Sequence, residues 1–163
     1  MATVNLNSDL GESYGSYVMG NDAEVLRIVG SANVACGFHG GDPVVMSDTV
    51  RLCRELGVSV GAHPGYHDIQ GFGRRPIPMS ERELEGLVAY QLGALMGIAA
   101  MEGTRVTHVK PHGALNNVAC EDDAVAAVIA RAVKAVDPSL IFLACTGTAL
   151  VRQGRAAGLP VAE

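Results

Sequence analysis

Histidine and carboxylate side chains that follow short apolar runs are the residues of this chain best suited to chemistry. Imidazole titrates near neutral pH and binds metal ions, and carboxylates can hold protons, water or cations. These polar residues come after the apolar runs, whereas the connections that lead into the runs are chemically bland. This asymmetry is typical of an enzyme built on parallel strands. The catalytic candidates are Asp9, Glu12, His39, His63, Lys110 and His112.

A second set of polar residues in the same loops is suited to binding a substrate or a phosphate group. Arg74 and Arg75 can clamp a carboxylate or phosphate through paired N–H groups, or they can form a solvated loop tip. Asp42 precedes Pro43, an arrangement more typical of a helix N-cap than of a catalytic acid. The glycine motifs of phosphate-binding loops are absent, so a nucleotide would need Lys110 and the two arginines as its cations. The binding candidates are Asn7, Asn33, Asp42, Asp68, Arg74, Arg75 and Asn116.

The spacing of the histidines leaves metal binding open. His63 and His67 are four residues apart, but Pro64 and Gly65 between them prevent the helix that would place both rings on one face. We therefore assign no metal ligand from the sequence. Ligands from different strands can still converge, as they do in barrel metal sites. The residues that could meet in this way are Asp9, His39, His63 and His112.

These candidates need a scaffold in which several strand ends meet. Short apolar runs alternate with helical periods, which predicts an α/β fold of parallel strands joined by right-handed crossovers. Both a (β/α) barrel and an open doubly wound sheet fit this alternation. A complete eight-stranded barrel takes roughly 250 residues, so we expect a barrel with about six of its βα units. Its open edge favours a homo-oligomer. The predicted strands are 3–7, 32–35, 58–61, 105–109, 140–144 and 159–162.

Capping residues mark the helices between the predicted strands. Asp42 and Pro43 begin a helix that Gly57 ends. Ser80 and Glu83 form a capping box at the start of the longest helix. Apolar residues at helical spacing predict two more helices, which lie near 125–133 and 148–158.

Composition limits the class of protein to which the chain can belong. Its 163 residues are 48% hydrophobic and 18% charged, which excludes intrinsic disorder and predicts a single, incomplete barrel domain over residues 1–163. A net charge of −5 argues against a nucleic-acid partner. No apolar run reaches the roughly 20 residues of a membrane helix, so we expect no membrane partner. The four cysteines include no C-x-x-C pair and are typical of reduced thiols in the cytoplasm.

Five segments, taken in order, resemble the signature motifs of the LamB/YcsF family, whose members are the A subunits of 5-oxoprolinase. The resemblance implies a parallel barrel of the glycoside hydrolase/deacetylase type. It also implies a small-molecule substrate, 5-oxo-L-proline, which is opened to L-glutamate with ATP hydrolysis, and two partner subunits, B and C. The segments are 5–15 (NLNSDLGESYG), 33–43 (NVACGFHGGDP), 62–68 (AHPGYHD), 72–75 (FGRR) and 109–115 (VKPHGAL).

The resemblance also implies roles for the candidate residues, with ATP and Mg²⁺ as cofactors. Lys110, Arg74 and Arg75 would stabilise charge on phosphoryl oxygens, and the histidines would transfer protons. Asp9 and Glu12 would position water, a substrate amine or Mg²⁺. Two alternatives stay open. The first is a metal-dependent amidohydrolase or deacetylase with histidine ligands, and the second is a shortened, noncatalytic binding protein, since family members reach about 250 residues as in a complete barrel.

Overall fold

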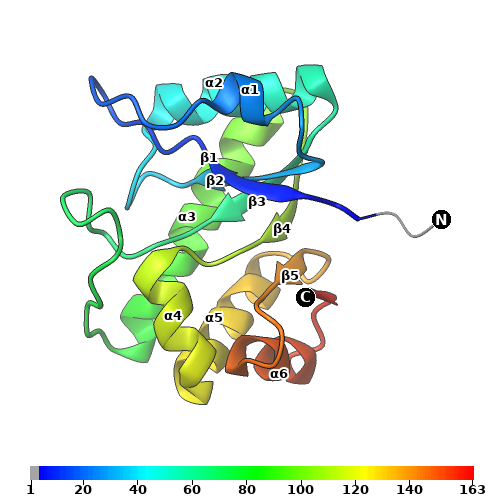
Figure 1. Ribbon diagram of the computed structural model, residues 1–163. Coiled ribbons are helices and arrows are strands. Elements are labelled where there is room, and N and C mark those ends of the chain that lie inside the picture. The colour runs from blue at the N-terminus through cyan, green and yellow to red at the C-terminus, as the bar shows by residue number, and fades with distance from the viewer. Residues whose placement is uncertain (1–3) are drawn as a thin grey trace.

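Six parallel strands form one curled sheet in the computed structural model, which describes residues 4–163 (Figure 1). The strands lie in the order β1-β2-β3-β4-β5-β6. A doubly wound sheet would reverse its strand order part-way, so the sequential order identifies the arrangement as half of a (β/α) barrel. The strands are β1 (Asn7–Leu10), β2 (Ser31–Ala35), β3 (Ser59–His63), β4 (Val106–Val109), β5 (Ile141–Leu143) and β6 (Val161–Ala162).

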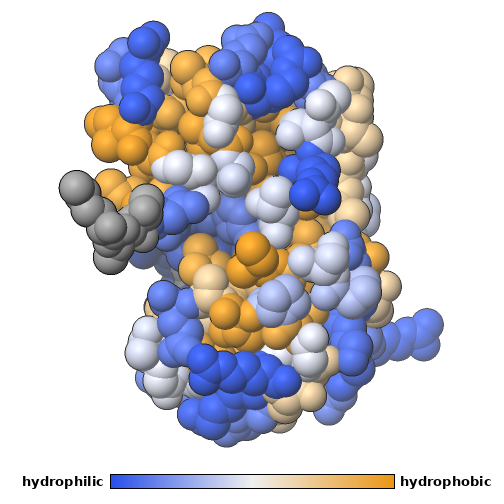
Figure 2. Space-filling view, turned by 90° about the vertical axis from the view of Figure 1, so that its right-hand side faces the viewer, coloured by the Kyte–Doolittle hydropathy of each residue, from blue (hydrophilic) through white to orange (hydrophobic). Residues whose placement is uncertain are grey.

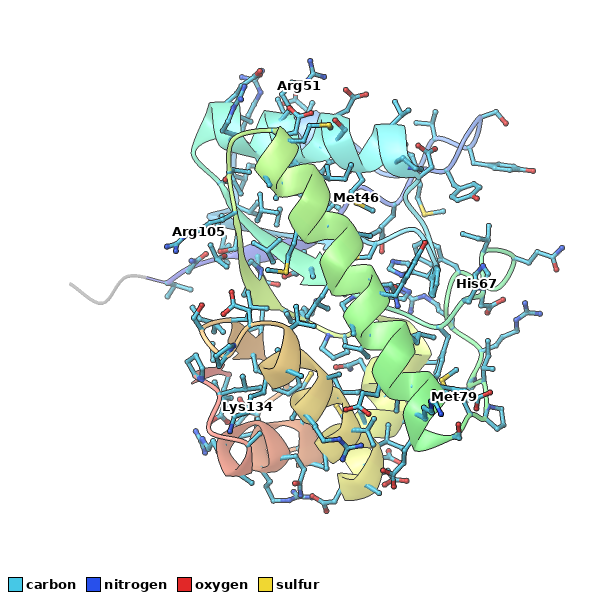
Figure 3. The ribbon with its side chains drawn as sticks, turned by 180° about the vertical axis from the view of Figure 1, so that it is seen from behind. Met46, Arg51, His67, Met79, Arg105 and Lys134 are labelled. Carbon is cyan, nitrogen blue, oxygen red and sulfur yellow. The ribbon has the colours of Figure 1, made fainter. Side chains whose placement is uncertain are left out.

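Helices connect the strands and cover the sheet. Figure 3, which views the molecule from behind, shows the longest helix, α3, crossing the back of the sheet. This helix packs against α2, α5, β3 and β4, and the buried aliphatic side chains between these elements form the core. The helices are α1 (Asp22–Val25), α2 (Pro43–Leu56), α3 (Glu81–Met101), α4 (Gly113–Glu121), α5 (Asp123–Val136) and α6 (Ala149–Ala156).

The predicted helix ends are confirmed. The Asp42 carboxylate accepts hydrogen bonds from the backbone N–H groups of Val44 and Val45 at 2.8 and 3.0 Å. Gly57 ends α2 with a left-handed φ of 70°, which costs least for a residue without Cβ. Both halves of the capping box of Ser80 and Glu83 are present at the start of α3. The short helices α1 and α4 were not predicted.

The first strand lies further along the chain than predicted. The prediction placed it at 3–7, of which Thr3 lies outside the described residues, but Val4 and Leu6 are 79% and 55% exposed. The observed β1 contains polar residues because Asn7 and Asp9 both accept hydrogen bonds from the Asn33 amide of β2. As a result, Asp9 lies within a strand and is held more rigidly than a loop residue.

The expectation that no segment reaches membrane-spanning length was wrong for α3. By length and composition alone its 21 residues, with a window of hydropathy 1.4, meet the criterion for a helix that could cross a membrane. The core helix of a globular domain meets the same criterion. Here Leu84, Val88 and Leu92 of α3 are buried inside the protein, and 33% of the window is buried in total.

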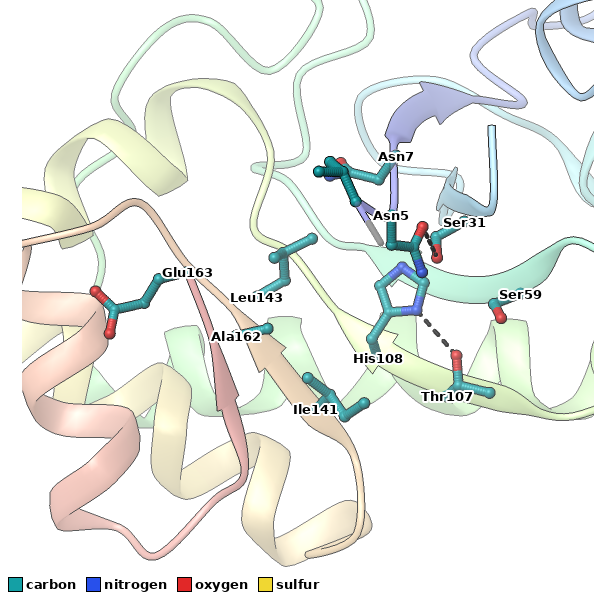
Figure 4. Close-up of a pocket in the computed structure, with 11 residues that line it drawn as sticks. Asn5, Asn7, Ser31, Ser59, Thr107, His108, Ile141, Leu143, Ala162 and Glu163 are labelled. Atoms are coloured by element: carbon teal, nitrogen blue, oxygen red, sulfur yellow. Dashed lines mark hydrogen bonds between the residues drawn. The ribbon is translucent and has the colours of Figure 1, made fainter. Parts of the chain in front are cut away.

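A cavity of about 570 Å³ opens at the side where the strands begin. Figure 2 shows this side of the molecule, and Figure 4 shows the cavity with its lining residues. The lining consists mostly of amide, hydroxyl and aliphatic side chains, together with His108 and Glu163. The cavity therefore lies away from the strand ends that carry the catalytic candidates.

Candidate functional site

All six catalytic candidates meet at the carboxyl-terminal edge of the sheet. In Figure 1 the loops that follow β1 and β3 project on the side opposite the N-terminus. The candidates come from four consecutive strands: Asp9 lies in β1, His63 is the last residue of β3, and the others lie in the segments after β1, β2 and β4. We call this group the strand-end cluster: Asp9, Glu12, His39, His63, Lys110 and His112.

An ion pair between Asp9 and Lys110 lies at the open side of the cluster. Lys110 Nζ donates a hydrogen bond to Asp9 Oδ1 at 2.7 Å, and His63 Nε2 lies 3.3 Å from Asp9 Oδ2. Burial by itself raises the pKa of Asp9, but the hydrogen bonds and charges of His63 and Lys110 outweigh burial and hold this pKa well below its usual value. Asp9 is therefore a carboxylate throughout the physiological pH range.

Two buried histidines lie behind this ion pair. His63 Nδ1 donates to the backbone carbonyl of Lys110 at 2.6 Å, and His63 Nε2 lies 3.0 Å from His112 Nδ1. His112 Nε2 donates to the carbonyl of Phe72 at 2.8 Å. Burial and the nearby His39 lower the pKa of His112 to about 4, which makes its neutral form the stable one at pH 7.

Glu12 and His39 complete the cluster. Glu12 Oε1 lies 3.2 Å from His39 Nε2 and 3.6 Å from His112 Nδ1. The His39 ring stacks on that of His112 with centroids 3.5 Å apart. One ligand atom from each of Glu12, His39, His63 and His112 lies within 4.8 Å of the others, so this group could hold a metal ion.

Two glycines allow the histidine rings to pack this closely. A Cβ on Gly65 would lie 2.7 Å from His39 Nδ1, and one on Gly73 would lie 2.8 Å from His112 Cδ2. The buried Gln91 of α3 holds Gly65 in place, because its amide accepts from Gly65 N and donates to Gly65 O, both at 2.9 Å. Sequence reasoning missed Gln91, although a glutamine within the apolar stripe of α3 was a signal for such a role.

A further buried histidine supports the cluster from within the sheet. His108 Nε2 donates to Asn33 Oδ1 at 3.0 Å, and Asn33 Nδ2 donates to Asp9 Oδ1 and Asn7 Oδ1, each at 2.8 Å. His108 thereby fixes which way the Asn33 amide points, and Asn33 in turn orients Asp9. The sequence indicated a structural role for His108 but not this connection to Asp9.

Residues 4–163 match the model of the LamB/YcsF family. The chain belongs to the LamB/YcsF family. It is 59% identical over 162 residues to a protein of Azoarcus sp. that is named as the A subunit of 5-oxoprolinase, covering 99% of this chain and 63% of that protein. It is 56% identical over 161 residues to the protein of the same name from Rhodopseudomonas palustris, covering 98% of this chain and 63% of that protein.

A solved structure has the same fold. The crystal structure of the lactam utilization protein from Thermus thermophilus matches with a TM-score of 0.96 and 49% sequence identity, over 98% of this chain and 65% of that one. The chain thus spans less than two thirds of the length of these relatives. The resemblance of the five motifs and the parallel barrel-type fold are both confirmed.

Several binding candidates of this LamB/YcsF chain are engaged in local contacts. Arg75 forms an ion pair with the buried Asp68, in which Arg75 Nε donates to Asp68 Oδ2 at 3.0 Å. Asp68 also accepts from Gly71 N at 3.0 Å, so the pair fixes the loop that carries Phe72. The exposed Arg74 lies over the Phe72 ring, with Cζ 5.7 Å from its centroid. Of the two arginines, Arg74 is therefore the one whose guanidinium lies outside this ion pair.

The other two binding candidates lie outside the cluster. Asp42 caps α2 and accepts a third hydrogen bond, from Gly15 N at 2.8 Å, which fits the N-cap interpretation. Asn116 lies in α4, where its amide contacts the neighbouring Asn117 at 3.4 Å. These two residues are thus accounted for by local structure.

Proposed function

We propose that this chain carries catalytic groups of the A subunit of a 5-oxoprolinase, acting with partner subunits B and C. The complex would open 5-oxo-L-proline to L-glutamate with hydrolysis of ATP. The observation that carries the proposal is the convergence of all six residues of the strand-end cluster, each from a segment that resembles the family motifs, in a chain whose relatives are named as that protein of 5-oxoprolinase. The four free cysteines fit a cytoplasmic location.

The cluster offers the groups that an ATP-dependent ring opening requires. A five-membered lactam is an unstrained amide, so its carbonyl carbon must be activated before water can attack. Transfer of the γ-phosphoryl group to the lactam oxygen releases ADP; water then adds to the ring carbon, the C–N bond breaks, and a second water releases phosphate. Lys110, and Arg74 when its loop closes, would stabilise the phosphoryl oxygens of ATP bound with Mg²⁺.

The remaining residues of the cluster would handle water and protons. Asp9 is oriented by Asn33 and Lys110 and can accept a hydrogen bond from the attacking water or the substrate amine. Glu12 lies beside His39 and could transfer protons with it. We propose that Asn7 and Asn33 act by holding Asp9, and that Asp68 and Arg75 act by shaping the Phe72 loop.

ATP-dependent release of glutamate from 5-oxoproline tests the proposal. The chain is mixed with subunits B and C, and a full-length relative serves as the positive control because this chain spans 63% of such proteins. We expect His39→Ala to abolish release and His67→Ala to leave it unchanged, since His67 is exposed and stacks on Phe38 outside the cluster. Equal rates in both variants would contradict the proposal.

A metal-dependent amidohydrolase or deacetylase is the second candidate function. The specific observation in its favour is the set of ligand atoms from Glu12 and three histidines within 4.8 Å. That reaction would proceed without ATP and stop on addition of a chelator, whereas the proposed reaction requires ATP. Binding of subunits B and C without turnover of either kind is the result expected of a noncatalytic protein.

A further inference from the structure

The protons of His63 and His112 can be located from their hydrogen bonds. His63 Nδ1 lies 2.6 Å from the carbonyl oxygen of Lys110, and His112 Nε2 lies 2.8 Å from that of Phe72. A carbonyl oxygen only accepts, so both of these ring nitrogens carry hydrogen. In a neutral imidazole the other nitrogen is then a lone pair. His63 Nε2 and His112 Nδ1 therefore face each other at 3.0 Å as two acceptors.

Two carboxylates face the same pair of nitrogens. Asp9 Oδ2 lies 3.3 Å from His63 Nε2, and Glu12 Oε1 lies 3.6 Å from His112 Nδ1. Four acceptor atoms thus come together with no donor among these contacts. One added proton on His63 Nε2 would leave Glu12 and His112 opposed, whereas a cation at the centre would attract all four atoms.

We propose that His63 Nε2, His112 Nδ1 and the Glu12 carboxylate bind one divalent transition-metal ion of the Zn²⁺ class. The inference goes beyond the proposed function, because it concerns ion binding by the chain whichever reaction the complex catalyses. An ion of this class acts as a Lewis acid and lowers the pKa of a bound water.

The spacing of the donor atoms fits such an ion. Zn–N and Zn–O bonds of about 2.1 Å in a tetrahedron place neighbouring ligand atoms about 3.4 Å apart. The separations of 3.0 Å between the two histidines and 3.6 Å between Glu12 and His112 lie on either side of that value. Both histidines also donate their second N–H to a backbone carbonyl, the support that metal-binding histidines usually have.

The choice of imidazole ligands favours a transition metal over Mg²⁺ or Ca²⁺, which prefer oxygen ligands. The histidine side chains are buried, at 1% and 3% exposed, while those of Asp9 and Glu12 are 36% and 16% exposed. Solvent and substrate therefore reach the proposed ion from the carboxylate side.

His39 is assigned a positioning role. Its ring is parallel to that of His112, at 3°, so the nitrogen lone pairs of the two rings lie in separate planes and do not converge on one ion. His39 Nε2 instead lies 3.2 Å from Glu12 Oε1 and can donate to it, which aims the carboxylate. The buried His39 Nδ1 has no hydrogen-bond partner within residues 4–163.

Metal binding by the purified full chain tests the proposal without any activity assay. Metal-free protein is dialysed against Zn²⁺ or Co²⁺, the bound metal is counted by mass spectrometry, and the visible spectrum of Co²⁺ reports its coordination. We expect one ion per chain and at least about tenfold weaker binding in His112→Asn and Glu12→Gln. His67→Asn is the matched control, because His67 is exposed and stacks on Phe38 away from the cluster.

Folding is checked by circular dichroism and melting. Glu12→Gln keeps the shape of a partly exposed side chain, so it serves if a histidine variant fails to fold. Zn²⁺ should raise the melting temperature of the unaltered chain and of His67→Asn but not of Glu12→Gln. The proposal is overturned if the folded chain retains no stoichiometric metal, if folded variants bind as tightly as the unaltered chain, or if nitrogen NMR in the presence of Zn²⁺ shows both nitrogens of His63 protonated. Metal binding without ATP-dependent glutamate release would contradict the proposed function alone.

Discussion

His63 and His108 are buried histidines on neighbouring strands, yet their surroundings differ in kind. They are 1% and 6% exposed. His63 ends β3 and faces the Asp9 carboxylate and a second histidine. His108 lies inside β4, where it contacts an amide and the hydroxyl of Thr107, the latter shown in Figure 4. Burial is thus common to both, and the charged neighbours of His63 are what suit it to chemistry.

The same contrast holds between the two ends of the sheet. The cavity where the strands begin is lined by side chains such as Ser31, Ser59 and Thr107, which form hydrogen bonds but do not titrate near pH 7. The opposite end gathers carboxylates, imidazoles and an ammonium group. Cavity size therefore does not locate the site here, because the reactive groups lie at the carboxyl ends of the strands.

Replacement of Lys110 should have the largest effect, because it removes the only ammonium group of the strand-end cluster. Lys110→Ala is expected to lower kcat for ATP-dependent glutamate release by about 10²–10³-fold, the usual loss when one transition-state donor is removed. The pKa of Asp9 should rise, since Lys110 is one of the two partners that lower it. Steady-state rates in the complete complex measure the first effect.

Lys134→Ala is the matched control for this variant. Lys134 Nζ donates to the carbonyl of Ala157 on the exposed surface, far along the chain from the cluster. We expect it to leave kcat unchanged. Similar losses in the two lysine variants would mean that the contrast between the cluster and the rest of the molecule has no catalytic meaning.

The sequence was sufficient to predict the scaffold and the members of the cluster. Capping signals such as Asp42-Pro43 and Ser80 with Glu83 are local, so they can be read without knowing the tertiary structure. Strand alternation placed the reactive residues at one edge, because parallel strands bring their carboxyl ends together. His39, His63 and His112 were grouped on that basis, and the structure brings them into contact.

Pairings between distant residues could not be predicted in the same way. The apolar Val4 and Leu6 suggested a strand, but the amide of Asn33, 24 residues beyond Asp9, selects the polar segment instead. Arg75 was expected to bind an anion, and its anion is Asp68 of the same loop. Such choices depend on which partner lies within about 3 Å in the folded chain, and hydrophobic periodicity does not report this.

Replacement of His108 should reduce stability without removing a reactive group. Burial first, and then the charges of His63 and Lys110, lower the pKa of His108 to about 4. Unfolding restores a pKa near 6.5, so the unfolded chain takes up a proton as the pH falls below 6.5 while the folded chain stays neutral down to about 4. Stability should therefore decrease over this pH window, by about 3 kcal/mol from His108.

His108→Asn tests this contribution. At pH 7 the variant should lose about 1–3 kcal/mol, because the hydrogen bond to the buried Asn33 is broken. The difference from the unaltered chain should then shrink as the pH falls toward 4, because the variant has no histidine to protonate at this position. Urea unfolding at several pH values measures both quantities. Parallel stability curves would show that His108 titrates normally in the folded chain.

A pair of glycine substitutions should separate the close-packed cluster from the solvent-facing surface, with the smallest effects. In Gly65→Ala the new Cβ would lie 2.7 Å from His39 Nδ1, and the stacked His112 ring leaves no room for His39 to move away. We expect a loss of about 1–3 kcal/mol in the free energy of unfolding. Gly93→Ala lies on the exposed face of α3 with no atom within 4 Å of the new Cβ, so it should gain about 0.5–1 kcal/mol from helix propensity. Equal stability of the two variants, measured by urea unfolding, would mean that the histidine stack is looser than its 3.5 Å separation indicates.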